Sequence, residues 1–110
     1  KEHPFFIRHG LDIFLEAQVP IFWAVLGGTI DVPTIDGKAS LKIPAGIQSG
    51  QILRMRGKGF PKLRGGQKGD QLVRIQVSTP KSLSKKEKDL FSELASLNGK
   101  LKPKFNKVDF

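Results

Sequence analysis

The chain has 110 residues, contains no cysteine and carries a formal net charge of +9 at pH 7. Its length suits one domain, or one small domain with an appendage. The missing cysteine excludes a disulfide, a Cys-based zinc site and a thiol nucleophile, and no apolar run approaches the roughly 20 residues of a membrane span. No signal peptide is visible. Because the sequence opens at Lys1 and its sole methionine is Met55, we expect a piece of a longer protein.

The first elements predicted are a strand and a short helix. Residues 11–19 alternate between apolar and polar side chains, which is typical of a half-buried strand. Phe14 interrupts the polar side of this pattern and indicates that this side is partly covered. Residues 20–28 begin with proline and end in two glycines, which predicts a short helix. Since this segment is apolar on every side, we expect it to be buried, with Trp23 filling the core.

Further short strands follow the helix. A strand around residues 30–32 is expected to end at Pro33, and Asp36 with Gly37 predicts the centre of a type I′ hairpin turn. Residues 38–43, 53–56 and 73–78 each alternate in the same way, which puts the arginines at 54 and 56 on a solvent face. Several short strands separated by turn residues predict a mainly β fold. We expect a two-layer sandwich or partial barrel with one short buried helix.

The stretch from residue 54 to residue 70 is basic and rich in glycine. Its cations are Arg54, Arg56, Lys58, Lys62, Arg64 and Lys68. Read alone, it indicates a loop that binds anions, and nucleic acid is the serious alternative because cations neutralise phosphates. Two observations argue against these interpretations. The stretch has a single aromatic residue, Phe60, on which a base could stack. It also lacks the hydroxyl residue that follows the lysine in a phosphate-binding loop. We therefore favour glycines that build turns and charges that are solvated, and we disfavour nucleic acid as a partner.

A helix is predicted after residue 80. Ser84 and Glu87 have the spacing of a capping box, and Gly99 ends the pattern. The apolar positions that follow at helical spacing are Leu90, Phe91, Leu94 and Leu97. This stripe either covers the chain's own β domain or pairs with a second copy, and we favour self-association. The last eleven residues are lysine-rich and read as a tail, or as an arm that orders against a partner.

The sequence contains no recognisable catalytic or metal-binding pattern. His3 and His9 have no acidic residue at a recurring ligand spacing, so we expect no metal. No pair of acids suggests a general acid and base, and no serine lies in a nucleophile elbow. We therefore expect no enzymatic activity and no cofactor.

Several motifs in order resemble the C-terminal substrate-binding region of the DnaJ (J-domain) co-chaperones. The matching segments are His3-Pro4-Phe5-Phe6 with Arg8, Gly10 and Asp12; Ala24 with Leu26-Gly27-Gly28; Val32-Pro33-Thr34-Ile35-Asp36-Gly37; Ile43-Pro44 with Gly46, Gln48 and Gly50; Arg54 with Arg56-Gly57-Lys58-Gly59 and Pro61; Gly69-Asp70; and Thr79-Pro80. Each motif alone is weak, but their common order and spacing over residues 3–97 are specific. The likeness is to the second of two β subdomains, followed by a dimerisation helix.

The resemblance implies a cytoplasmic, stress-response chaperone module that binds unfolded polypeptides and works with a DnaK-type ATPase through its full-length parent. It divides the chain into a hinge or strand at 1–10, a peptide-binding subdomain at 11–80 and a dimerisation segment at 81–110. By analogy with the first subdomain, a client groove would be lined by Leu15, Ala17, Ile30 and Val32, and a homodimer would form through Leu90, Phe91, Leu94 and Leu97. The family's His-Pro-Asp triad and zinc repeats are not in this sequence.

Overall fold

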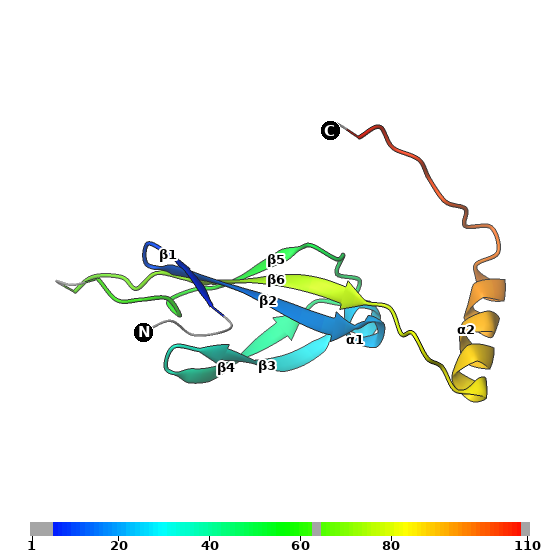
Figure 1. Cartoon of the computed structure of the whole chain (residues 1–110), viewed down its shortest axis with the longest axis horizontal. Coiled ribbons are helices and arrows are strands. Elements are labelled where there is room, and N and C mark those ends of the chain that lie inside the picture. The colour runs from blue at the N-terminus through cyan, green and yellow to red at the C-terminus, as the bar shows by residue number, and fades with distance from the viewer. Residues whose placement is uncertain (1–5, 63–64, 109–110) are drawn as a thin grey trace. The chain divides into compact units, whose positions relative to one another are not determined.

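The computed structural model of the chain describes residues 6–62 and 65–108 (Figure 1). The chain divides into two compact units, Lys1–Thr79 and Pro80–Phe110. In the described residues the first unit contains the strands and a short helix, and the second contains one longer helix.

The larger sheet combines strands from both ends of the first unit. In spatial order its strands are β1 (Ile7–His9), β2 (Asp12–Pro20), β6 (Gln71–Ser78) and β5 (Ile52–Met55). The central strands β2 and β6 are parallel, whereas β1 and β5 pair antiparallel with their neighbours. The parallel pair therefore joins segments that are far apart in sequence, and the intervening chain has to cross over between them.

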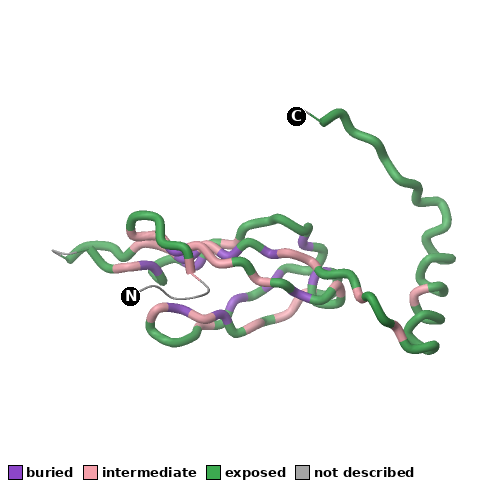
Figure 2. Tube along the Cα trace, viewed as in Figure 1, coloured by how far each residue is buried: buried purple, intermediate pink, exposed green. Residues whose placement is uncertain are grey.

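The smaller sheet is a hairpin of β3 (Gly28–Thr34) and β4 (Gly37–Ile43). The short helix α1 (Ile21–Leu26) connects β2 to this hairpin. Buried residues from both sheets, from α1 and from the loop after β4 form one cluster: Val19, Ala24, Val32, Leu41, Ile43, Ile47, Met55, Val73 and Ile75. Figure 2 colours the buried residues purple. The core thus lies between two β layers that do not close into a barrel, which confirms the predicted mainly β class.

The prediction of a buried helix with Trp23 in the core is wrong. Only Ala24 of α1 is buried, while Trp23 is 37% exposed and Leu26 is 76% exposed. The helix has six residues, too few turns to place more than one narrow face against the sheets. The ring of Trp23 lies instead against the backbone of Gly28, where an added Cβ would collide with it.

Two expectations about the hairpin are also wrong. Pro33 lies inside β3, opposite Lys38, and does not end the strand. Its carbonyl oxygen points away from β4 and accepts a hydrogen bond from Gln71 Nε2 at 2.8 Å, so the missing amide removes no hydrogen bond from the hairpin. The two turn residues are Ile35 and Asp36, not Asp36 and Gly37, and neither has a positive φ. The positive φ falls on Gly37, at 135°, and in the described part of the chain only glycines have positive φ.

In the second unit, helix α2 (Lys85–Leu97) begins as predicted. Ser84 Oγ accepts a hydrogen bond from Glu87 N at 3.2 Å, and Glu87 Oε1 accepts one from Ser84 N at 2.8 Å, which completes the capping box. None of its residues is buried. Neither this helix nor α1, the two in the described part of the chain, has the length and apolar character that a membrane span requires.

These packing differences predict losses of stability of different size for two aliphatic truncations. Ile75→Ala should lower the free energy of unfolding by about 2–5 kcal/mol, because Ile75 is fully buried between the sheets. Leu26→Ala on α1 should cost less than about 1 kcal/mol, since its side chain is largely in water. Urea denaturation followed by circular dichroism measures both, and equal losses would contradict the arrangement of the core.

Candidate functional site

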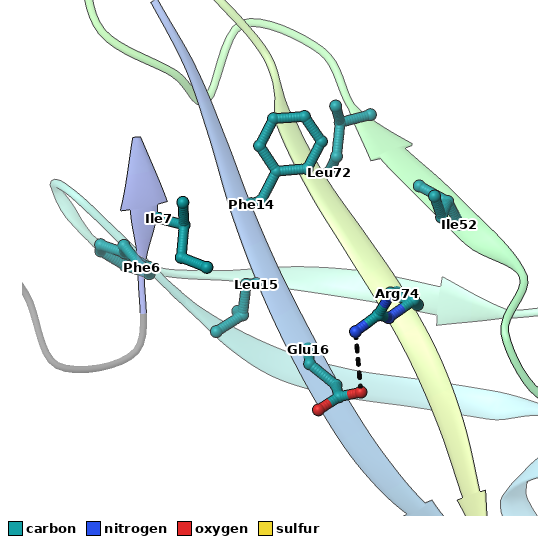
Figure 3. Close-up of a pocket in the computed structure, with 8 residues that line it drawn as sticks. All are labelled: Phe6, Ile7, Phe14, Leu15, Glu16, Ile52, Leu72 and Arg74. Atoms are coloured by element: carbon teal, nitrogen blue, oxygen red, sulfur yellow. Dashed lines mark hydrogen bonds and ion pairs between the residues drawn. The ribbon is translucent and has the colours of Figure 1, made fainter. Parts of the chain in front are cut away.

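A hollow of about 530 Å³ lies mainly on the face of the larger sheet that points away from the core. We call it the outer hollow. Its lining residues are Phe6, Ile7, Phe14, Leu15, Glu16, Ile52, Leu72 and Arg74 (Figure 3). Most of the lining is apolar, and it comes from all four strands of the sheet and the residue before β1.

Strand alternation and register explain why these side chains meet. Along β2 the buried side chain of Ile13 points inward, so Phe14 points outward. Phe14 is level with Ile7 of β1 on one side and with Leu72 of β6 on the other. These three residues therefore form an apolar row across the sheet, and Ile52 of β5, which is 53% exposed, extends the apolar surface.

The charged residues of the hollow neutralise each other. Glu16 and Arg74 are level with each other on β2 and β6, and Arg74 Nη2 donates to Glu16 Oε1 at 3.3 Å (Figure 3). Both side chains are about half exposed, so the pair contributes little to stability. Its main effect is that the outer hollow carries no net charge of its own.

Only one of the four predicted groove residues lines this hollow. Leu15 does so, although it also packs against the core cluster, as the partly buried Ala17 and Ile30 do. Val32 is 1% exposed and belongs to the core itself. A groove lined by these four residues stays a prediction. The other lining residues were not predicted, although Phe14, an apolar residue on the polar side of its strand pattern, was a signal for them.

The predicted dimerisation residues lie together on α2. Leu90 and Leu94 are each 54% exposed, Leu97 is 78% exposed and Phe91 is half-buried. The helix thus presents an apolar stripe to solvent. The residues that follow continue this character without helix or strand, with Leu101, Phe105 and Val108 exposed.

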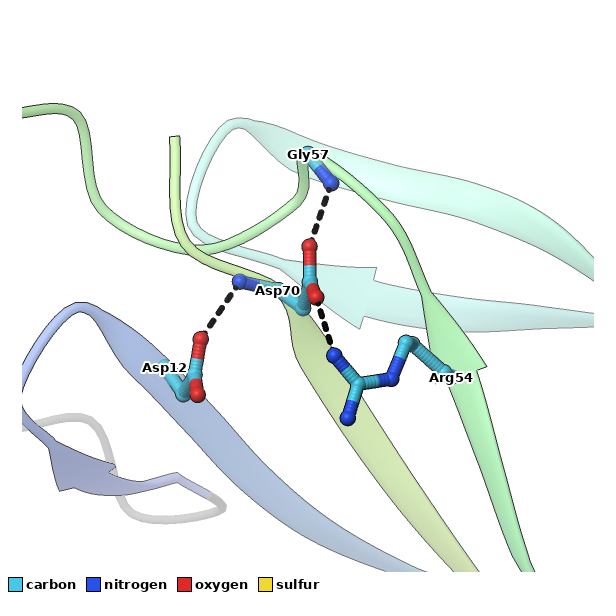
Figure 4. A network of polar contacts seen from close by, with 4 residues as sticks. All are labelled: Asp12, Arg54, Gly57 and Asp70. Atoms are coloured by element: carbon cyan, nitrogen blue, oxygen red, sulfur yellow. Dashed lines mark hydrogen bonds and ion pairs between the residues drawn. The ribbon is translucent and has the colours of Figure 1, made fainter. Parts of the chain in front are cut away.

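Asp70 connects the two ends of the basic segment. Its carboxylate accepts hydrogen bonds from Gly57 N at 3.0 Å and from Arg54 Nη1 at 2.6 Å (Figure 4). The backbone bond from Gly57, followed by the bond from Arg54, lowers the pKa of Asp70 below its usual 3.8. The backbone N–H of Asp70 donates in turn to Asp12 Oδ1 at 2.7 Å, which ties β6 to the start of β2.

Two glycines allow three backbone segments to meet beside this carboxylate. Gly59 N donates to Gly69 O, and Gly69 N donates to Phe60 O, both at 2.8 Å. Phe60 N donates to Leu11 O at the same distance. A Cβ on either glycine would collide with that Leu11 oxygen, so a larger residue cannot be placed there without displacing backbone. These two glycines are therefore structural, as the sequence analysis favours.

The basic segment is only partly free to bind anions. Arg54 is committed to Asp70, and Lys68 lies 3.9 Å from Asp36. The guanidinium of Arg8 covers the ring of Phe60 at 4.1 Å from its centroid, which occupies the segment's single aromatic. Arg64 lies outside the described residues. The loop thus has one aromatic ring beside its charges, and a cation already covers one face of that ring.

Metal ligands do not gather in the described residues. No three side chains of His, Cys, Asp or Glu come close enough there to share an ion. His9 packs edge-on against Phe14, with ring centroids 6.1 Å apart. His3 lies outside the described residues.

A two-sheet β domain with an apolar hollow on one sheet face, followed by a helix with an exposed apolar stripe, has the features of a binding domain. The sequence model of the DnaJ C terminal domain family matches residues 1–80, and the chain belongs to this family. Proteins described as "Chaperone protein DnaJ" from Opitutus terrae, Brevibacillus choshinensis and Halalkalibacterium halodurans are each 50% identical to it over 99 residues, or 90% of the chain. The chain spans only 26–27% of the length of these relatives.

The Asp70 contacts predict a specific dependence of stability on pH. A carboxyl group whose pKa is lowered in the folded state stabilises the fold fully above its usual pKa, and that contribution is lost as the pH falls through the lowered value. Asp70→Asn should therefore be less stable than wild type at neutral pH. The difference should shrink as the pH falls below the usual pKa of 3.8.

Urea denaturation over this pH range measures the effect. Asp31→Asn is the control, because Asp31 forms only an exposed ion pair, at 3.7 Å from Lys38. If the Asp70→Asn variant and wild type differ by the same amount at every pH, Asp70 does not have the role assigned to it.

Proposed function

We propose that this chain is the polypeptide-binding and dimerising module of a DnaJ-type co-chaperone. The observation that carries the proposal is the outer hollow, an apolar surface without net charge on a sheet face that would otherwise be polar. Family membership supports a role in protein folding. In the parent protein the module would hold unfolded clients for a DnaK-type chaperone in the cytoplasm, with no catalysis or cofactor of its own.

The outer hollow suits a segment of unfolded polypeptide. Ile7 is 71% exposed and Ile52 is 53% exposed, so a client that covers them removes apolar surface from water at roughly 25 cal/mol per Å². An extended chain presents side chains alternately and can place every second one against such a surface. We therefore propose the outer hollow, which includes Leu15, as the main client contact in place of the groove between Leu15, Ala17, Ile30 and Val32.

The remaining parts of the chain receive roles from the family resemblance. We propose that residues 1–10 lead in from a preceding β subdomain, that residues 11–80 bind clients and that residues 81–110 form a homodimer. The exposed stripe of Leu90, Leu94 and Leu97 supports the last assignment, because large apolar side chains that recur along one helix face are typical of helix pairing.

Removal of one apolar side chain should weaken client binding. Ile52→Ser should reduce the affinity for an unfolded, apolar peptide by about 5-fold or more, because Ile52 contributes exposed apolar surface to the hollow. Val25→Ser is the matched control, since Val25 is 58% exposed on α1 and does not line the hollow. Fluorescence anisotropy with a labelled peptide measures both. Equal weakening by the two variants would refute the assignment.

Replacement of apolar side chains in the stripe on α2 should weaken the proposed dimer. The intact chain should sediment at twice its mass of 12.2 kDa, and Leu90→Ser combined with Leu94→Ser should raise the dissociation constant at least about tenfold. Lys88→Ser on the opposite side of the helix should leave it unchanged. Sedimentation equilibrium measures these values, and a monomeric intact chain at high concentration would overturn the proposed dimer.

A further inference from the structure

Strand β5 connects the outer hollow to exposed cations. Ile52, at the start of the strand, lines the hollow. Arg54 follows on the same face, and Arg56 comes directly after the strand ends at Met55. Arg56 and Lys58 are both exposed. The apolar surface therefore continues along β5 into a positively charged one.

The cations at this end of β5 are not neutralised equally. The charge of Arg54 is balanced by Asp70 at 2.6 Å, and that of Arg74 by Glu16 at 3.3 Å. Arg56 and Lys58 form no ion pair with any residue in the described part of the chain. Arg56 also lies close enough to Asp70 to contribute to the lowered pKa of that carboxyl group. An excess of positive charge thus remains beside the hollow.

The distance between the two surfaces matches a short stretch of extended polypeptide. A strand rises about 3.3 Å per residue, so Ile52 and Arg56 are separated by roughly 13 Å along the chain. Four residues of an extended client span the same length. A client with an apolar side chain in the hollow therefore brings a residue about four positions away close to Arg56, and Lys58 follows in the sequence after the turn at Gly57.

We propose that the outer hollow prefers extended polypeptide segments in which Asp or Glu stands about four residues from the apolar residues that it binds. This inference rests on the proposed function and defines the class of client. Arg56 and Lys58 would attract the carboxylate, and the hollow would bury the apolar side chains. Charges at the rim of a binding surface act mainly on the association rate and on the choice of partner.

The neighbourhood of the cations favours an acidic polypeptide over nucleic acid. Binding of single strands relies on aromatic rings that stack on bases, and Phe60 is already covered by Arg8. The surface next to the cations is an apolar hollow, which suits aliphatic and aromatic side chains better than a phosphate backbone. Nucleic acid remains an outcome that the experiment distinguishes.

The test compares fluorescein-labelled ten-residue peptides bound to the full 110-residue chain. One has Leu-Phe-Leu followed, four residues on, by two Asp; a second has the Asp pair before the apolar residues; a third has Asn in place of Asp. We expect at least one acidic peptide to bind roughly 3- to 10-fold more tightly than the Asn peptide at low salt. This advantage should largely disappear near 1 M salt, where charges are screened over about 3 Å.

Paired charge variants locate the effect. Arg56→Gln with Lys58→Gln should abolish the preference for the acidic peptide and leave the affinity for the Asn peptide unchanged. Lys38→Gln with Lys42→Gln removes the same charge from exposed positions on β4 and should retain the preference. Both double variants lower the net charge equally, so a difference between them cannot come from overall charge.

The possible outcomes separate this inference from the function on which it rests. If no peptide binds, including the Asn peptide, the proposed function fails and this inference fails with it. If all three bind with equal affinity, client binding stands and the preference for acidic segments is wrong. If a single-stranded oligonucleotide of ten nucleotides binds more tightly than the acidic peptides, and only the Arg56→Gln, Lys58→Gln variant loses it, the cations serve nucleic acid and the inference is overturned.

Discussion

The parallel pairing of β2 with β6 determines both faces of the larger sheet. It aligns Phe14 with Leu72 and Glu16 with Arg74 on the outer face, while Ile13, Val73 and Ile75 point into the core. Because side chains alternate along a strand, a shift of one residue would exchange the two faces and remove core and hollow together. The contacts at Asp70 fix this register where β6 begins: its N–H donates to Asp12 and its C=O accepts from Ile13 N at 2.9 Å.

This constraint also explains where the family resemblance is strongest. Arg8, Gly10, Asp12, Gly57, Gly59, Gly69 and Asp70 all belong to the motifs, and in the structure they take part in one connected set of contacts at this end of the sheet. Their role is to hold the loop between β5 and β6 against the turn before β2. The outer hollow depends on Phe14, Leu72 and Ile52, which lie outside those motifs. The motifs thus belong to the scaffold, and the strand register forms the outer hollow on it.

Local patterns in the sequence were sufficient for most of the strands and for α2, although the end of β3 was misplaced. The capping box of Ser84 and Glu87 depends on neighbouring residues alone, and it forms as predicted. The pairing of strands is nonlocal, so the sequence did not indicate that Phe14 and Leu72 would lie side by side. The prediction that Trp23 is buried in the core was wrong for a related reason. The apolar character of a segment does not show whether another element covers it. Pro33 is tolerated in β3 because its ring nitrogen faces away from β4.

The outermost strands of the larger sheet are short, three residues in β1 and four in β5. A long, flat sheet edge would offer its unpaired backbone groups as a template on which an unfolded chain could grow into a fibril. Edges of three and four residues provide few such groups, and Arg54 places a charge on one of them. If the domain binds unfolded polypeptide as proposed above, short edges of this kind would keep it from seeding the ordered assembly of the segment that it holds.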